Sequence, residues 1–159
     1  MGRFIFVSLG LLVVAFSLSG IAADHHCPYD WFSHNVSCYK VFNNPKSWEE
    51  AQRICQEEKE NGHLASINDV EESMILSEEI IKSSRIWNIL DVWIGLRLSK
   101  RTGKWGWSDG SNVTLTRWEE GEPNNFLGRE FCAALTVKSR YLQWNDKNCG
   151  RWNRFVCKF

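Results

Sequence analysis

Five side chains in the last third of the chain could together bind a hard cation. Calcium takes about six to eight oxygen ligands in flexible geometry, whereas magnesium tends to keep its water shell. Three carboxylates and two amides therefore predict a calcium site with room left for oxygens from the backbone, water or a ligand. Each acid alone would be read as a solvated loop carboxylate, so the prediction depends on the set. The set is Glu122, Asn124, Glu130, Asn145 and Asp146.

Two of these residues lie two positions apart in Glu122-Pro123-Asn124. Residues so spaced point to the same side of an extended chain, but they need a fixed bend to converge on one ion. An X-Pro bond can be cis at little cost, and tight turns are where this occurs. We therefore predict a cis peptide before Pro123.

The cysteines indicate a disulfide framework. All six follow an apolar leader, and an even number of cysteines in an exported chain is typical of disulfides, although spacing leaves about 15 connectivities open. Cys132 follows Glu130 and Cys149 follows Asp146, so a Cys132–Cys149 bridge would join the two halves of the ligand set. A zinc site is the rival interpretation, and the lack of a CxxC pair disfavours it. The six are Cys27, Cys38, Cys55, Cys132, Cys149 and Cys157.

The first 23 residues predict a secretory signal peptide. Arg3 precedes an apolar run over residues 4–16, and Ala22-Ala23 provides a small-residue cleavage site. That run is short for a bilayer core of about 30 Å, so we expect cleavage, secretion and no membrane insertion. The expected domains are a leader at 1–23 and one folded domain at 24–159. Asn35-Val36-Ser37 and Asn112-Val113-Thr114 are glycosylation acceptors, which would have to be on the surface.

Two helices are predicted in the first half, after a strand at residues 39–42. Ser47 and Glu50 form a capping box that starts the first helix, and Gly62 indicates its end. Asn68 and Glu71 predict the start of the second helix, which ends near residues 82–84. Helical spacing predicts which residues face inward: Trp48, Ala51 and Cys55 in the first helix, and Val70, Met74 and Ile81 in the second.

The second half predicts strands at residues 92–96, 131–137, 141–144 and 154–159. Between the first two lies a long loop region, residues 99–125, with Gly103, Gly106, Gly110 and Gly121 as turn points. Two helices followed by short strands and a long irregular region indicate an α+β domain.

Several motifs together resemble the C-type lectin domain over essentially the whole chain after the leader. The resemblance extends to the sugar-binding lectins of the snake venom branch. The motifs are Cys27/Cys38, Trp93-Ile94-Gly95-Leu96, Trp105-Gly106-Trp107-Ser108-Asp109-Gly110, Glu122-Pro123-Asn124, Glu130 two before Cys132, and Trp144-Asn145-Asp146 before Cys149.

The resemblance implies bridges Cys27–Cys38, Cys55–Cys157 and Cys132–Cys149. It also implies that the five oxygen-bearing residues are the principal calcium ligands and that a Glu-Pro-Asn triplet goes with mannose-type sugars, as Gln-Pro-Asp goes with galactose. Many members carry a further calcium site that uses acids before the triplet. Here residues 98–104 are basic, so we expect that auxiliary site to be missing.

A physical basis for the sugar preference follows from hydrogen-bonding roles. Two neighbouring hydroxyls of a sugar could complete the calcium shell, and each hydroxyl also has a proton to donate and a lone pair to offer. Carboxylates only accept, whereas amides can also donate. We assign Glu122 and Asn124, joined by Pro123, as the specificity pair, Glu130 and Asn145 as the second pair, and Asp146 mainly as an ion ligand.

Other functions are weighed against this one. Some venom relatives bind receptors or clotting factors instead of sugar, but by resemblance they have usually lost the calcium residues and gained a cysteine that joins two chains. A glycosidase pair at Glu122 and Glu130 would be held ionised by bound calcium, so neither could donate a proton. A formal net charge of zero disfavours nucleic acid. Because single sugar contacts are weak, we expect a noncovalent homodimer that agglutinates cells.

Overall fold

The computed structural model describes residues 26–84 and 89–159, so the predicted leader lies outside the described residues. The elements alternate between strands and helices in the first half and are mainly strands in the second, which confirms the α+β class. In chain order they are β1 (Phe32–His34), β2 (Ser37–Lys46), α1 (Trp48–Glu58), β3 (His63–Leu64), α2 (Val70–Ser83), β4 (Val92–Leu98), β5 (Trp105–Trp107), the 3₁₀ turn η1 (Phe126–Gly128), β6 (Cys132–Leu135), β7 (Trp144–Lys147) and β8 (Asn153–Lys158).

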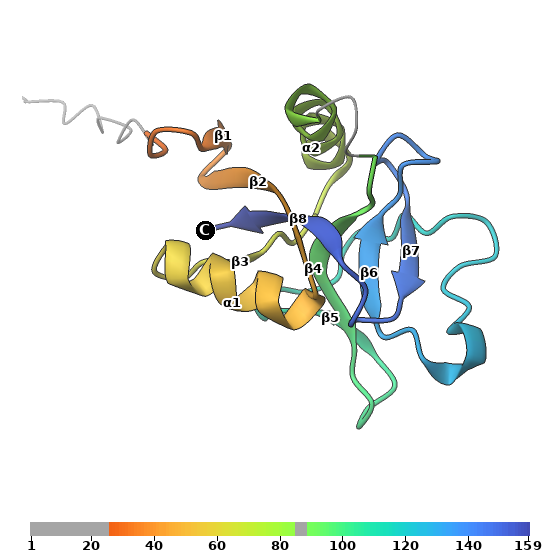
Figure 1. Cartoon of the computed structure of the whole chain (residues 1–159). Coiled ribbons are helices and arrows are strands. Elements are labelled where there is room, and N and C mark those ends of the chain that lie inside the picture. Colours follow the sequence, from red (N-terminus) through yellow and green to blue (C-terminus); the bar gives the residue numbers. More distant parts are fainter. Residues whose placement is uncertain (1–25, 85–88) are drawn as a thin grey trace, which may run out of the picture.

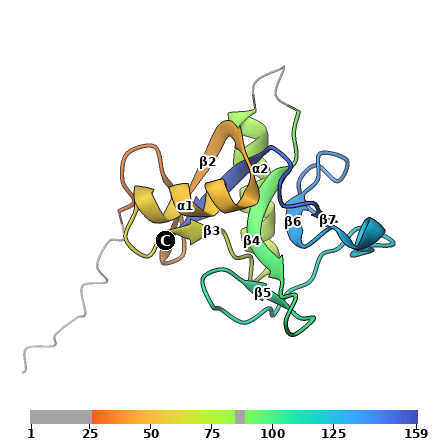
Figure 2. The same ribbon diagram turned by 60° about the horizontal axis from the view of Figure 1, so that its bottom comes forward.

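The described strands form one sheet in the order β1-β2-β8-β4-β6-β7, with β3 added beside β8 and β5 beside β4. All pairs are antiparallel except β4 with β8, which is parallel. Figure 1 shows α2 above and α1 below the strands β2 and β8. The far end of the sheet, β6 and β7, carries the long loop and η1, which Figure 2 shows on the side away from α1.

The predicted capping box starts α1. The Glu50 peptide N–H donates to Ser47 Oγ at 3.4 Å, and the Ser47 N–H donates to Glu50 Oε2 at 3.1 Å. The predicted inward face of this helix is buried. Its end requires glycine, because a Cβ on Gly62 would lie 2.1 Å from the Cys55 carbonyl oxygen.

The start of α2 differs by one residue from the prediction. Its N-cap is Asp69, whose Oδ1 accepts from the Glu72 N–H at 2.8 Å, and not Asn68 with Glu71. Glu72 is buried because its carboxylate accepts from the Tyr39 hydroxyl and from Lys158 Nζ, the latter at 2.7 Å. A buried charge needs such partners, and both come from distant strands.

The predicted inward face of α2 is wrong. Val70, Met74 and Ile81 keep 48 %, 53 % and 38 % of their surface exposed. The buried face includes Leu76 and Ile80 and is otherwise polar, with Ser77 Oγ donating to the Arg140 carbonyl at 2.7 Å. The buried residues of α2 are Glu72, Ser73, Leu76, Ser77 and Ile80.

One predicted strand begins too early. Residues 141–143 form a turn, and β7 runs from Trp144 to Lys147. Arg140 and Tyr141 have φ of 55° and 62°, a left-handed conformation that does not continue a strand. Tyr141 is nevertheless buried, with its hydroxyl donating to the Leu90 carbonyl at 3.3 Å.

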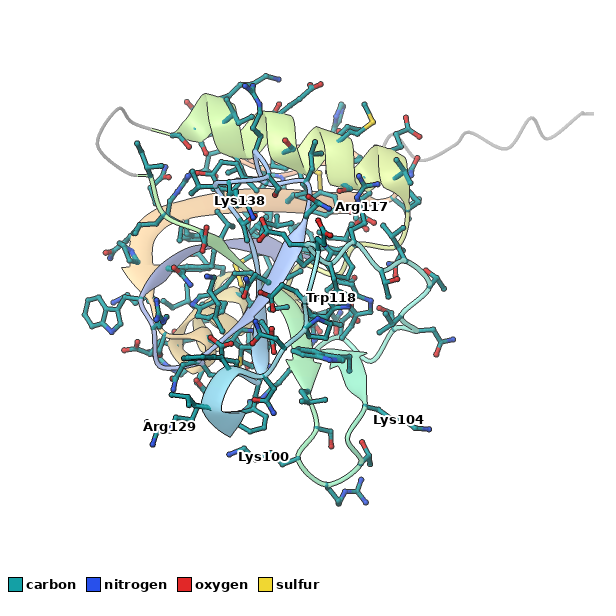
Figure 3. All side chains as sticks on the ribbon, turned by 90° about the vertical axis from the view of Figure 1, so that its right-hand side faces the viewer. Lys100, Lys104, Arg117, Trp118, Arg129 and Lys138 are labelled. Carbon is teal, nitrogen blue, oxygen red and sulfur yellow. A yellow bond between two sulfur atoms is a disulfide. The ribbon has the colours of Figure 1, made fainter. Side chains whose placement is uncertain are left out.

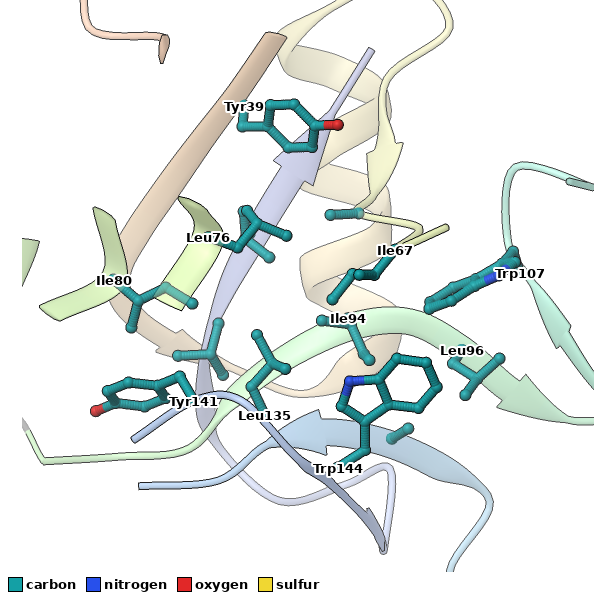
Figure 4. Close-up of a cluster of buried hydrophobic side chains, with 14 residues drawn as sticks. Tyr39, Ile67, Leu76, Ile80, Ile94, Leu96, Trp107, Leu135, Tyr141 and Trp144 are labelled. Atoms are coloured by element: carbon teal, nitrogen blue, oxygen red, sulfur yellow. The ribbon is translucent and has the colours of Figure 1, made fainter. Parts of the chain in front are cut away.

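Two apolar clusters form the core. One lies between α2, β4 and the β6–β7 end of the sheet and contains Ile94, Leu135 and Trp144 (Figure 4). The other lies under α1 and contains Trp48, Trp93 and most of the cysteines. Three disulfides are formed, Cys27–Cys38, Cys55–Cys157 and Cys132–Cys149, which are the pairs that the resemblance implies.

Candidate functional site

The loop that carries the predicted ligands is anchored on β7. Trp144 N–H donates to the Arg117 carbonyl and Glu119 N–H donates to the Trp144 carbonyl, both at 2.8 Å. The rings of Trp118 and Trp144 meet edge to face with centroids 5.6 Å apart. Figure 3 shows Trp118 beside the strands at the centre of this face. The chain therefore enters the 120–130 loop from a fixed position against the sheet.

Glu122 connects three of the predicted residues. The Glu122–Pro123 peptide is cis, as predicted. Glu122 Oε1 accepts from Asn124 Nδ2 at 2.9 Å and from Asn145 Nδ2 at 3.0 Å. Asn145 lies in β7, where it pairs with Ala134 of β6. One carboxylate oxygen thus joins the loop to the sheet, with the two amides on either side of it.

Asp146 fixes the same loop from below. Its side chain is fully buried, and its two oxygens accept from the peptide N–H groups of Asn124 at 3.0 Å and Asn125 at 2.7 Å. A buried polar group needs hydrogen-bond partners, and these two N–H groups supply them. Asp146 holds Asn124 in place, whatever else it binds.

Glu130 reaches the group through Asn125, a residue that the sequence analysis did not select. Asn125 Oδ1 accepts from the Glu130 N–H at 3.0 Å, and Glu130 Oε2 accepts from the Phe126 N–H at 3.1 Å. Asn125 has φ of 44°, a left-handed conformation that asparagine tolerates. Its place directly after the Glu-Pro-Asn triplet was the one signal for it in the sequence.

The electrostatics of the loop favour a bound cation. Burial raises the pKa of Glu122, as do the neighbouring carboxyl of Asp146 and the charge of Glu130, against a smaller lowering by the Asn124 N–H. A positive charge beside Glu122 would oppose this shift, because a nearby opposite charge favours the ionised form of a carboxyl. Within the described residues, no lysine or arginine forms an ion pair with Glu122, Glu130 or Asp146.

The donor set fits calcium in kind. Within residues 26–84 and 89–159, no three acid, histidine or cysteine side chains come close enough to form a metal site on their own. Here the carboxylates accept from peptide and amide N–H groups instead, and two amides complete the predicted set. Rotation of an amide exchanges its nitrogen for its oxygen, so that Asn124 and Asn145 could offer acceptors beside Glu122 and Asp146.

Residues outside this loop show other roles. Gln52 Nε2 and His63 Nδ1 lie 2.9 Å apart, while Gln52 Oε1 accepts from the Leu64 N–H, so this histidine belongs to the join between α1 and β3. Both predicted glycosylation acceptors, Asn35 and Asn112, are exposed. No helix in the described part of the chain is long and apolar enough to span a membrane.

A disulfide-linked α+β domain with this sheet order, carrying a loop of carboxylates and amides, defines a class of binding domain. The family model "Lectin C-type domain" matches residues 44–159, and the chain belongs to the C-type lectin family. It is 72 % identical to "C-type lectin lectoxin-Phi1" of Philodryas olfersii over the full length of both chains. Like its relatives it is a non-enzymatic binding protein.

Two solved structures share the fold. "Human lithostathine" is 30 % identical with a TM-score of 0.77, covering 84 % of this chain and 98 % of that one. The cow C-type carbohydrate-recognition domain of CD23, solved "in the presence of GlcNAc2Man3 oligosaccharide", is 29 % identical with a TM-score of 0.72. That match covers 85 % of this chain and 96 % of the CD23 chain.

Proposed function

We propose that this protein is a calcium-dependent lectin that binds mannose-type glycans on glycoproteins or glycolipids. The observation that carries the proposal is the contact of Glu122 with both Asn124 and Asn145 across the loop and β7, at 2.9 and 3.0 Å. The accepting carboxylate oxygen of Glu122 thus lies between the two donating amides of Asn124 and Asn145. Neighbouring hydroxyls of a sugar need both acceptors and donors.

The proposed ion ligands are Glu122, Asn124, Glu130, Asn145 and Asp146. Bound calcium would supply positive charge to which two neighbouring hydroxyl oxygens of a sugar can be attracted. Glu122 and Glu130 would accept the hydroxyl protons, and Asn124 and Asn145 would donate to the hydroxyl lone pairs. Pro123 holds Glu122 and Asn124 in one turn, so their order fixes which diol orientation is satisfied. A diol of the wrong orientation leaves these polar groups unpaired and is rejected.

The test is retention on immobilised mannose. We expect the protein to bind in calcium and to be released by a chelator or by free mannose. The matched variant is Glu130→Gln, which keeps the shape of the side chain but removes the charge of one proposed ion ligand. We expect this variant to lose mannose binding and to pass through the column. Retention without calcium, or no release by mannose, would contradict the proposal and favour a protein-binding role on receptors or clotting factors.

We further propose that the chain is secreted after removal of residues 1–23, as part of a venom, and that it crosslinks cells as a noncovalent homodimer. All six cysteines are paired within the chain, so a covalent dimer would need a bridge to be exchanged. Haemagglutination in calcium and sedimentation as a dimer at the same concentration are the expected results. If the protein sediments as a monomer and still agglutinates cells, the proposed dimer is wrong.

A further inference from the structure

A basic surface lies beside the 120–130 loop and takes no part in the proposed lectin site. The β4–β5 hairpin carries Lys100, Arg101 and Lys104, all exposed, and Arg129 follows η1 nearby. Figure 3 shows Lys100 extending from the hairpin on the side where Arg129 lies, with Lys104 on the other side. We refer to these four residues and Arg97 as the basic surface. Arg97 lies in β4, just before the hairpin.

The charges of this surface are nearly uncompensated. Arg97 forms an ion pair with Glu49 at 3.0 Å, whereas the other four cations form no ion pair within the described residues. The chain as a whole has a formal net charge of zero, so this is a local excess. Uncompensated cations on one face attract anions by their summed field.

The surface is hollowed and has an aromatic floor. Two adjoining hollows, of about 650 and 310 Å³, share Arg97, Lys100 and Phe131 in their walls. Among the residues that the structure describes, Glu49 is the one acid that lines either of them. The Arg97 guanidinium lies 5.0 Å from the Trp48 ring and Lys100 Nζ lies 4.4 Å from the Phe131 ring. These cation–π contacts hold the charged groups over the floor of the hollows.

The hairpin that presents these cations is ordered by its own hydrogen bonds. The Ser99 N–H donates to the Lys104 carbonyl at 2.9 Å and the Gly103 N–H donates to the Ser99 carbonyl at 2.8 Å. Gly103 has φ of 66°, which a glycine adopts without strain. At its base, the Leu98 N–H donates to the Phe131 carbonyl at 2.8 Å. A preorganised surface loses less conformational entropy on binding.

We infer that the basic surface binds a linear sulfated polysaccharide of the heparin type, independently of calcium. The cations are spread from Arg129 across the hairpin to Lys104 and do not converge on one point, which suits a polymer with repeated sulfates better than a single phosphate. Arginine guanidinium groups can bind oxyanions with two parallel hydrogen bonds. Arg101 and Arg129 supply two that form no ion pair within the described residues, whereas Arg97 already contacts Glu49.

The experiment measures binding of a fluorescent heparin oligosaccharide in the presence of a chelator. We expect wild type to bind and its affinity to fall steeply with salt, as counterion release requires. The variant Lys100→Glu with Lys104→Glu should bind about 10-fold more weakly or worse and show a shallower salt dependence. The control is Lys82→Glu with Lys138→Glu, which changes the net charge equally at exposed positions elsewhere and should stay within about 2-fold of wild type.

Three results would overturn the inference: no heparin binding by wild type, an equal loss of binding in the control, or tighter binding to phosphatidylserine vesicles than to heparin. Circular dichroism melting of each variant separates lost binding from lost folding. Because the assay contains no calcium, a failure of the mannose test leaves its result intact, and the reverse also holds.

Discussion

The long segment between β4 and β6 has two ends of opposite character. At the first end the hairpin around residues 99–104 projects from the sheet with three exposed cations, and within the described residues its backbone hydrogen bonds are to itself and to its base. At the second end the loop around residues 122–130 is acidic, and its peptide groups are held by the buried Asp146 of β7. The hairpin thus keeps its shape by its own hydrogen bonds, whereas the shape of the 122–130 loop depends on Asp146 of the sheet.

The difference indicates how each end would respond to substitution. Removing a charge from the hairpin removes one contribution to a summed field, and the hairpin keeps its shape. Removing Asp146 leaves the Asn125 N–H without its acceptor and the Asn124 N–H with Glu122 Oε2 alone, at 3.1 Å, so that the loop loses support together with a proposed ion ligand. The predictions below test this contrast, from the largest expected effect to the smallest.

Asp146→Ala should abolish both calcium and mannose binding. We expect calcium affinity to fall by more than about 100-fold, beyond the usual cost of losing an outer partner of a ligand. Isothermal titration with calcium measures this. Heparin binding by the same variant should fall by no more than about 3-fold, because only Arg129 of the basic surface lies in the loop that Asp146 holds, whereas Arg97 and the hairpin cations do not rest on Asp146; an equally large loss would show that the two ends are coupled.

The pair Glu122→Gln with Asn124→Asp should change sugar preference and keep calcium binding. Exchanging the order of acceptor and donor in the turn should shift the ratio of galactose to mannose binding by about 10-fold or more towards galactose. Competition of the two free sugars for the immobilised protein measures the ratio. An unchanged ratio would mean that this pair does not set specificity.

Acid should weaken calcium binding. The pKa of Glu122 is raised by burial and by its acidic neighbours, so protons compete with calcium at a higher pH than for an ordinary glutamate. Without calcium, the raised pKa of Glu122 in the folded state means that the folded protein loses stability as pH rises through that pKa. Bound calcium should reverse this loss. The increase in melting temperature caused by calcium should therefore shrink several-fold as pH falls through the pKa of Glu122. An increase that did not depend on pH would place the ion elsewhere.

Arg101→Ala should have the smallest effect on folding. Arg101 is exposed at the hairpin, and surface substitutions of this kind usually change the free energy of unfolding by less than about 0.5 kcal/mol. Urea unfolding measures this. A cost several times larger would show that the basic end is also required for the fold.

Features whose partners are close in sequence could be predicted. The capping box of α1 needs only Ser47 and Glu50, and the cis bond at Pro123 is a property of one dipeptide. The loop itself was identified because acids and amides gather around two cysteines. The disulfide pairing needed the family resemblance, since spacing did not decide between connectivities.

Features whose reason lies elsewhere in the chain could not be predicted. The register of α2 depends on Glu72, which is buried because Tyr39 and Lys158 surround it, and a sequence window around the helix contains neither. Apolar spacing instead selected Val70 and Met74, which are exposed. In the same way, Tyr141 was assigned to a strand by its type, but it packs inward from a turn. The role of Asn125 depends on Asp146 and Glu130, which lie on either side of a folded loop.

The pairing of β2 with β8 brings the two ends of the described fold to one side of the molecule. Figure 1 shows β1 and the C-terminus at the left, and η1 with the candidate sugar loop at the lower right. A tag, a label or a surface linkage attached after Phe159 would therefore leave the recognition loops facing solvent. Molecules tethered in this way would all present their loops in the same direction, which suits the sugar competition on immobilised protein described above.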